Sequence, residues 1–285
     1  MKALAHYIMR GPLQAVTVAV IAIALPLMYW LGAASVGLVT LRKGVDVGFK
    51  VFLWALLPAG GWFAFLNDPG PLMVVSMSWG MALTLRSTSS WEMVFGVGSL
   101  LGIVTGWLSA YLMPELLVEL VELTRQLYTD INPELMRSMG DDLDVTLTAL
   151  MKGSFAATYF TLALLGLVVA RSWQAMLFNP GGFRKEFHSF RLSGRFSLVS
   201  VVLLMLSPTL GVNALMLVLV LSICLSSAGL ALVHGVIAKK NLGGHWLIAF
   251  YVSALFLGPS LFVLLVFVAV ADSWFDFRNR IGAPQ

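Results

Sequence analysis

One histidine in an apolar part of the chain could take part in proton transfer. His234 ends an otherwise uncharged run that begins at Phe196, and an imidazole changes its charge near neutral pH, so it can relay a proton. A neutral histidine that is hydrogen-bonded between helices would explain the same residue. The sequence contains no zinc-protease, nucleotide-binding or nucleophile-elbow motif. It therefore predicts that the protein is not an enzyme and needs no cofactor or metal.

A second group of charged side chains follows the last apolar run. Asp272 and Asp276 are four residues apart, so they share one face of a helix, and Arg278 comes directly after them. Two carboxylates on one face could bind a cation or a partner protein. The three aromatic residues that lie among these charges favour another interpretation, an aromatic anchor at the membrane surface with the charges in the cytoplasm.

The composition shows what surrounds these residues. Hydrophobic residues make up 59% of the 285 residues and charged residues only 11%, whereas a soluble domain has roughly 25% charged residues. The run from Pro12 to Leu41 has no charge, and about 20 apolar residues are enough for a helix to cross a membrane. The sequence predicts an all-α fold, a polytopic transmembrane helical bundle that forms a single domain over residues 1–285.

Two apolar runs are too long for one crossing and too short for two. The first, Pro12 to Leu41, would be about 45 Å long as a helix, and Pro26 interrupts it; the second is interrupted by Gly258 and Pro259. Broken helices can line a ligand cavity in the membrane, although a proline can also merely kink a packed helix. We therefore expect about eight membrane segments (eight to ten), some discontinuous. They are 13–31, 33–41, 48–66, 71–86, 92–113, 147–170, 196–208, 211–238, 245–257 and 259–276.

Acidic and basic residues occupy different parts of the chain. Residues 114–146 carry eight acidic and two basic side chains, a net charge of −6, although the whole chain has a net charge of +4. Because Lys- and Arg-rich loops stay in the cytoplasm, we expect residues 114–146 to be extracytoplasmic and both termini to be cytoplasmic, in a bacterial inner membrane. The segment is amphipathic, so it could cover an outward-facing cavity or simply connect two spans.

The loop 171–195 is basic and rich in phenylalanine. Arg184, Lys185, Arg191 and Arg195 alternate with aromatic residues, which is typical of a surface helix on anionic lipid. Docking of a cytoplasmic partner is the alternative. The patch is short and lies between membrane segments, so we do not expect nucleic-acid binding.

Small residues at intervals of four predict close helix packing. Gly98, Gly102 and Gly106 share one face of their segment, where glycine lets a neighbouring backbone approach closely. Ala15 and Ala19 are a weaker instance of the same pattern. We expect packing within the chain, with an interface between proteins as the alternative.

Three signatures together resemble the YybS-like family of bacterial membrane proteins, whose function is unknown. They are the proline-broken N-terminal run that ends in Leu41-Arg42-Lys43-Gly44, the glycine-rich segment that ends near Gly106, and the stretch from Asp272 to Arg278. The resemblance implies a fold similar to the S components of energy-coupling-factor transporters. In those proteins an Ala-x3-Ala motif, matched here by Ala15 and Ala19, contacts the coupling subunit. The acidic segment and the additional C-terminal helices depart from the six-helix pattern of S components.

Two functions follow from these observations. The first is binding or transport of a small molecule in a cavity of the helical bundle, alone or with partner membrane subunits. The second is a non-transporting scaffold or accessory subunit in envelope or lipid processes. A polar-lined pocket at mid-membrane depth would favour the first, and a solid, glycine-packed bundle would favour the second.

Overall fold

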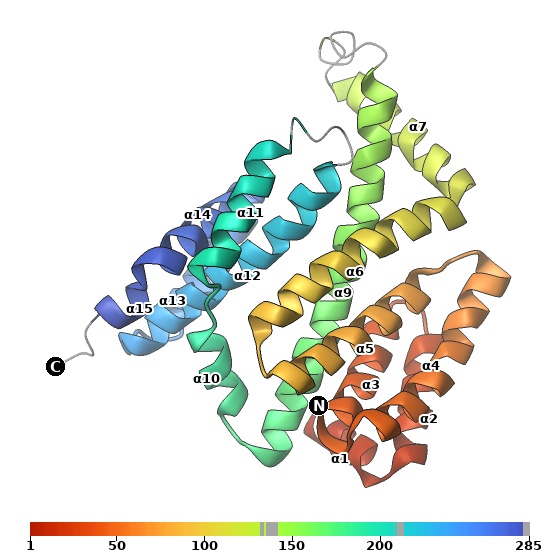
Figure 1. The fold of residues 1–285 in the computed structure, drawn as a ribbon, viewed down its shortest axis with the longest axis vertical. Coiled ribbons are helices and arrows are strands. Elements are labelled where there is room, and N and C mark those ends of the chain that lie inside the picture. Colours follow the sequence, from red (N-terminus) through yellow and green to blue (C-terminus); the bar gives the residue numbers. More distant parts are fainter. Residues whose placement is uncertain (132–133, 135–141, 208, 210–213, 282–285) are drawn as a thin grey trace.

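The computed structural model describes residues 1–131, 134, 142–207, 209 and 214–281. These residues form helices joined by short connections, and no strand occurs in this part of the chain. The predicted all-α fold is therefore confirmed. Figure 1 shows two groups of helices on either side of one long helix, α9 (Asp142–Phe178).

The first group, which we call the N-terminal bundle, packs along one side of α9. Helices α3, α5 and α6 pack directly against α9, and α2 and α4 pack against α3. The ten consecutive residues of α3 from Gly32 to Leu41 are all buried, so this helix is enclosed on every side. Besides α9, the bundle comprises α1 (Lys2–Arg10), α2 (Pro12–Ala24), α3 (Tyr29–Lys43), α4 (Val45–Leu66), α5 (Gly70–Thr88) and α6 (Trp91–Leu112).

The chain breaks at Pro26, between α2 and α3. Leu27 adopts a left-handed conformation with a φ of 62°, and α3 then folds back along α2. The Ser35 hydroxyl donates a hydrogen bond of 3.2 Å to the Ala15 carbonyl oxygen, which joins the two helices. The N-terminal run thus forms a helical hairpin, and Pro26 lies at its exposed tip.

Helix α9 is longer than a membrane is thick. Its 37 residues span about 55 Å at 1.5 Å per residue, which is more than the roughly 30 Å of hydrocarbon that one crossing needs. Near its start it packs against the acidic helix α7 (Pro114–Ile131). Arg125 of α7 forms ion pairs with Glu122 and with Asp144 of α9. Of the predicted acidic segment, residues 132–133 and 135–141 lie outside the described residues.

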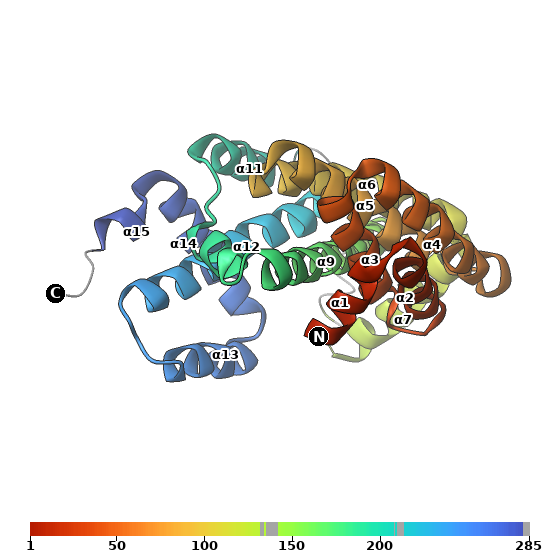
Figure 2. The ribbon, with the colours of Figure 1, turned by 90° about the horizontal axis from the view of Figure 1, so that it is seen from below.

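The second group, which we call the C-terminal arm, is built on α12. This helix packs between α9 and α14, and α11 rests on α12 and α14. Helix α13 has no buried residue, and Figure 2 shows it standing apart from the other helices. Helix α10 (Gly182–Ser189) links α9 to the arm. The arm comprises α11 (Gly194–Leu206), α12 (Ala214–Lys239), α13 (His245–Leu257), α14 (Pro259–Phe275) and α15 (Phe277–Arg280).

Among the described residues, four helices are long and apolar enough to cross a membrane by themselves: α4, α6, α9 and α12. A fifth is added if α10 and α11, which meet at an angle of 56°, count as one bent span. The expected number of about eight is not confirmed. Several predicted segments form helices that are shorter or less apolar than a full span, such as α2, α13 and α14.

Candidate functional site

A groove opens between α9, α12 and the junction of α13 with α14. We call it the lateral groove; its volume is about 890 Å³. Its lining residues come from the middle of α9 and α12 and from the start of α14. They are Ala157, Thr158, Thr161, Leu162, Leu164, Leu219, Ser222, Ile223, Ser226, Ser227, Leu230, Gly258, Pro259, Phe262 and Leu265.

The break between α13 and α14 forms one end of this groove. Gly258 has a φ of 51° and a ψ of −130°, a backbone conformation that residues with a side chain rarely adopt. Pro259 then occupies the first turn of α14, where its missing N–H costs no hydrogen bond. The helix is therefore truly interrupted here, and the predicted break at Gly258 and Pro259 borders a cavity.

The lining of the groove combines apolar side chains with hydroxyl groups. Thr158 and Thr161 of α9 face Ser222, Ser226 and Ser227 of α12 across it. The hydroxyls of Ser226 and Ser227 donate to the Ile223 carbonyl, at 3.2 and 2.7 Å, so their oxygen atoms still have acceptor capacity. The groove can thus hold an apolar molecule and offer weak hydrogen bonds to polar atoms within it.

A smaller pocket adjoins the groove at the end near α10. We call it the aromatic pocket; it has a volume of about 240 Å³ and shares Leu164, Ser227 and Leu230 with the groove. Phe95 and Phe190 stack there with ring centroids 5.1 Å apart. The other residues of its lining are Trp91, Val168, Phe183 and Phe187.

Helix α10 closes the aromatic pocket with one of its faces. Phe183 and Phe187, one turn apart, line the pocket, while Arg184 and Lys185 between them are exposed. Glu186 points sideways and pairs with Arg171 through two hydrogen bonds, one of them 2.9 Å long. The helix is amphipathic, with its aromatic face on the pocket and its cations outward.

His234 joins α12 to α13. Its Nε2 atom lies 2.8 Å from the Tyr251 hydroxyl oxygen, within hydrogen-bond distance, and its ring meets the Phe187 ring edge-on at 5.3 Å. The histidine that the sequence suggested as a proton relay, or as a neutral residue hydrogen-bonded between helices, thus lies where α10, α12 and α13 meet. It does not line the lateral groove.

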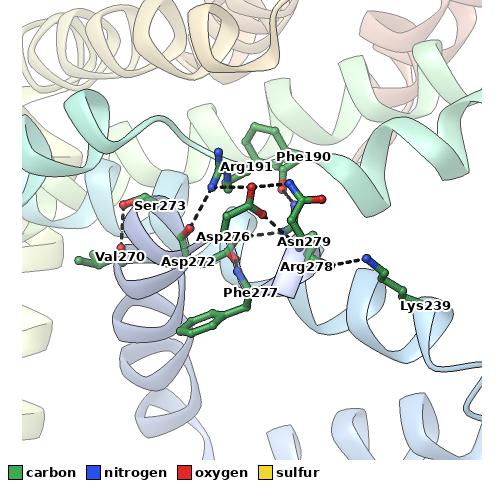
Figure 3. A network of polar contacts seen from close by, with 10 residues as sticks. All are labelled: Phe190, Arg191, Lys239, Val270, Asp272, Ser273, Asp276, Phe277, Arg278 and Asn279. Carbon is green, nitrogen blue, oxygen red and sulfur yellow. Dashed lines mark hydrogen bonds and ion pairs between the residues drawn. The ribbon is translucent and has the colours of Figure 1, made fainter. Parts of the chain in front are cut away.

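The charged residues near the C-terminus form a network with the chain before α11 (Figure 3). Asp272 is 2% exposed; one of its carboxylate oxygens accepts a hydrogen bond of 2.9 Å from the Phe277 amide, and the other lies 3.6 Å from the Arg278 guanidinium. Arg191 pairs with Asp276 at 3.2 Å. The two aspartates predicted as a cation or partner site therefore act as counter-ions for arginines of the same chain.

Arg278 is the centre of this network. It donates a hydrogen bond of 2.6 Å to the Phe190 carbonyl oxygen, and its own carbonyl oxygen accepts one of 2.5 Å from Lys239. Burial lowers the pKa of its guanidinium, while the neighbouring Asp272 carboxylate opposes that shift. The network thus fastens α15 to the end of α12 and to the aromatic pocket.

The small-residue motifs lie in the interior of the N-terminal bundle. Ala15 and Ala19 are fully buried and covered by α3, so in this structure they do not form an exposed surface. Gly98, Gly102 and Gly106 all face α9, and a Cβ atom at Gly106 would lie 2.9 Å from the Lys152 carbonyl oxygen. Arg195, predicted with the basic loop, is exposed at the start of α11.

The hydroxyl groups of the groove and the aromatic pocket were not among the features predicted from the sequence. Ser226 and Ser227 follow Ser222 by four and five residues in an uncharged run, and this spacing places both next to Ser222 on one side of the helix. That signal was present in the sequence. The aromatic pocket, in contrast, joins residues of α6, α9, α10 and α12, and no local pattern reports such an arrangement.

These features define the protein as a helical membrane protein with a lateral groove in its C-terminal half. Among the residues that the structure describes, no three potential metal-ligating side chains lie close enough together to hold an ion. No family model, no curated protein and no solved structure matches the chain. Membership of the YybS-like family therefore stays a prediction.

Proposed function

We propose that the protein binds a small apolar or amphipathic molecule in the membrane, in the lateral groove. The observation that carries this proposal is the groove itself: about 890 Å³ of space beside a broken helix, with five hydroxyl-bearing residues in an apolar lining. Ligand pockets are typically apolar cavities of roughly 300–1,000 Å³ with a few polar groups. We also propose that the protein transports the bound molecule, either by itself or together with partner subunits.

A membrane scaffold is the competing function. Its support comes from α7 and α10, two amphipathic helices at opposite ends of α9 that have no buried residues. Such helices can dock other proteins or lie on the lipid surface. A scaffold does not need the groove, so the two functions differ in whether a molecule is retained there.

Native mass spectrometry of the gently extracted protein tests the proposal. We expect the protein to retain a small molecule in a fixed stoichiometry. Thr161→Trp places a large side chain in the groove and is expected to abolish retention. The matched control is Leu165→Trp, one turn further along α9 at an exposed position outside the groove. Equal retention by both variants, or no retained molecule in the unmodified protein, would contradict the proposal.

The same proposal includes the orientation of the protein in a bacterial inner membrane, with both termini in the cytoplasm. It is supported by the positions of acidic α7 and basic α10 at opposite ends of α9 (Figure 1). Single cysteines near Asp130 and near Lys185, in a background without Cys224, test it. Labelling near Asp130 only from the cytoplasmic side would overturn the orientation.

A further inference from the structure

We infer that the molecule held in the lateral groove is an anionic lipid, whose head group is bound by Arg184 and Lys185 of α10. Its acyl chains would lie in the aromatic pocket and the groove. This inference rests on the proposed function and adds the chemical class of the ligand.

The aromatic pocket lies between the lateral groove and helix α10. The aromatic pocket and the lateral groove share Leu164, Ser227 and Leu230, so the two spaces adjoin, and we take them as one path for an extended apolar chain. Helix α10 covers one end of this path with Phe183 and Phe187, and its Arg184 and Lys185 are exposed. A molecule that occupies the path has one end beside α10.

The exposed surface of α10 carries two positive charges, Arg184 and Lys185. Three acidic residues nearby already have cationic partners: Glu186 pairs with Arg171, Asp272 with Arg278, and Asp276 with Arg191. A fourth, Glu92, accepts hydrogen bonds from Ser193. In the part of the chain that the structure describes, no ion pair involves the exposed Arg184 and Lys185. An anion from outside the chain is the complement of this surface.

Another pocket, next to Trp91, also contains cations, but it fits an anion less well than the surface of α10 does. It has a volume of about 450 Å³ and contains Arg86 and Arg171. Arg86 donates to the carbonyl oxygen of Leu41 at 2.7 Å, and Arg171 is held by Glu186. Both guanidinium groups thus serve contacts within the chain, whereas the cations of α10 have no ion-pair partner among the described residues.

The test compares two lipids with the same acyl chains, phosphatidylglycerol and phosphatidylcholine, by native mass spectrometry of the full-length protein. We expect the unmodified protein to bind the anionic lipid roughly tenfold more tightly, because each basic residue near the surface favours anionic lipid. The double variant Arg184→Gln/Lys185→Gln should lose most of this preference. The matched control, Lys43→Gln/Lys50→Gln, removes two exposed cations elsewhere and should keep it.

Each outcome distinguishes this inference from the proposed function. Equal binding of both lipids by the unmodified protein overturns the inference and leaves the groove as a site for neutral molecules. An unchanged preference in the Arg184/Lys185 double variant overturns the assigned head-group position. Binding of neither lipid overturns the inference, whereas the proposed function is overturned only by the retention test on the Thr161→Trp variant. Inorganic phosphate should not displace the lipid; displacement at millimolar phosphate would point to a soluble anion and also overturn the inference. Thermal unfolding of each variant shows whether it is folded.

Discussion

The N-terminal bundle and the C-terminal arm consist of similarly apolar helices, yet they pack differently. In the bundle, small residues bring helices together until α3 is buried over ten consecutive positions. In the arm, α13 buries no residue and α11 buries only two serines. Apolar sequence alone therefore does not determine whether a helix faces its neighbours or lipid. The solid bundle expected of a scaffold and the open cavity expected of a binding protein occur in different halves of one chain.

The largest loss of stability is expected where the helices of the N-terminal bundle pack most closely. Gly106→Val adds a branched side chain where a single Cβ atom would already lie 2.7 Å from the Ala156 Cβ atom, so α6 and α9 must separate. We expect a loss of about 3 kcal/mol in the free energy of unfolding, measured by thermal unfolding in detergent. The control is Gly60→Val in α4, where nothing lies within 4 Å. Similar stability of the two variants would show that the bundle is not closely packed.

A smaller effect is expected at the charged network that fastens the arm. Asp272→Asn leaves the Arg278 guanidinium without its buried counter-ion, while the asparagine oxygen can still accept the Phe277 amide hydrogen bond. We therefore expect a loss of about 2 kcal/mol, below the range for a fully broken buried pair. Asp276→Asn, at the more exposed ion pair with Arg191, should cost less than about 1 kcal/mol. If Asp276→Asn lost more stability than Asp272→Asn, the main ion pair of the network would be Arg191 with Asp276 and not Arg278 with Asp272.

The smallest effect concerns α13 alone. Tyr251→Phe removes the side-chain hydrogen bond to His234, worth about 1 kcal/mol. Because α13 buries no residue, this loss should loosen the helix locally without changing the unfolding temperature of the protein by more than a few degrees. A nitroxide at Leu255 of α13 should report faster motion in electron paramagnetic resonance spectra, and one at Leu100 of α6 should not. Equal changes at both labels would contradict the difference between the two regions.

Much of the secondary structure could be predicted from the sequence. The expected segments 245–257 and 71–86 correspond to α13 and α5 within two residues at each end, because apolar runs bounded by glycine, proline or charge mark helix limits directly. Which of these helices cross the membrane could not be predicted from the apolar runs in the same way. Whether a run crosses the membrane or folds back, as at Pro26, depends on contacts with helices distant in the sequence.

The candidate site was predicted only in part. Gly258 and Pro259 were expected to border a cavity because they interrupt an apolar run, and they do line the groove. The pairing of Arg191 with Asp276 joins residues 85 positions apart, and charge counting alone treats such residues as free surface cations and anions. Tertiary packing decides which charges neutralise each other, and so which ones remain for a ligand.

A structure of the protein determined in lipid nanodiscs would test the central claim most directly. The account predicts an elongated density between α9 and α12 that reaches from Gly258 to the aromatic pocket, with its polar end beside Arg184 and Lys185. A groove filled by side chains of α13, with the two halves packed equally closely, would contradict it.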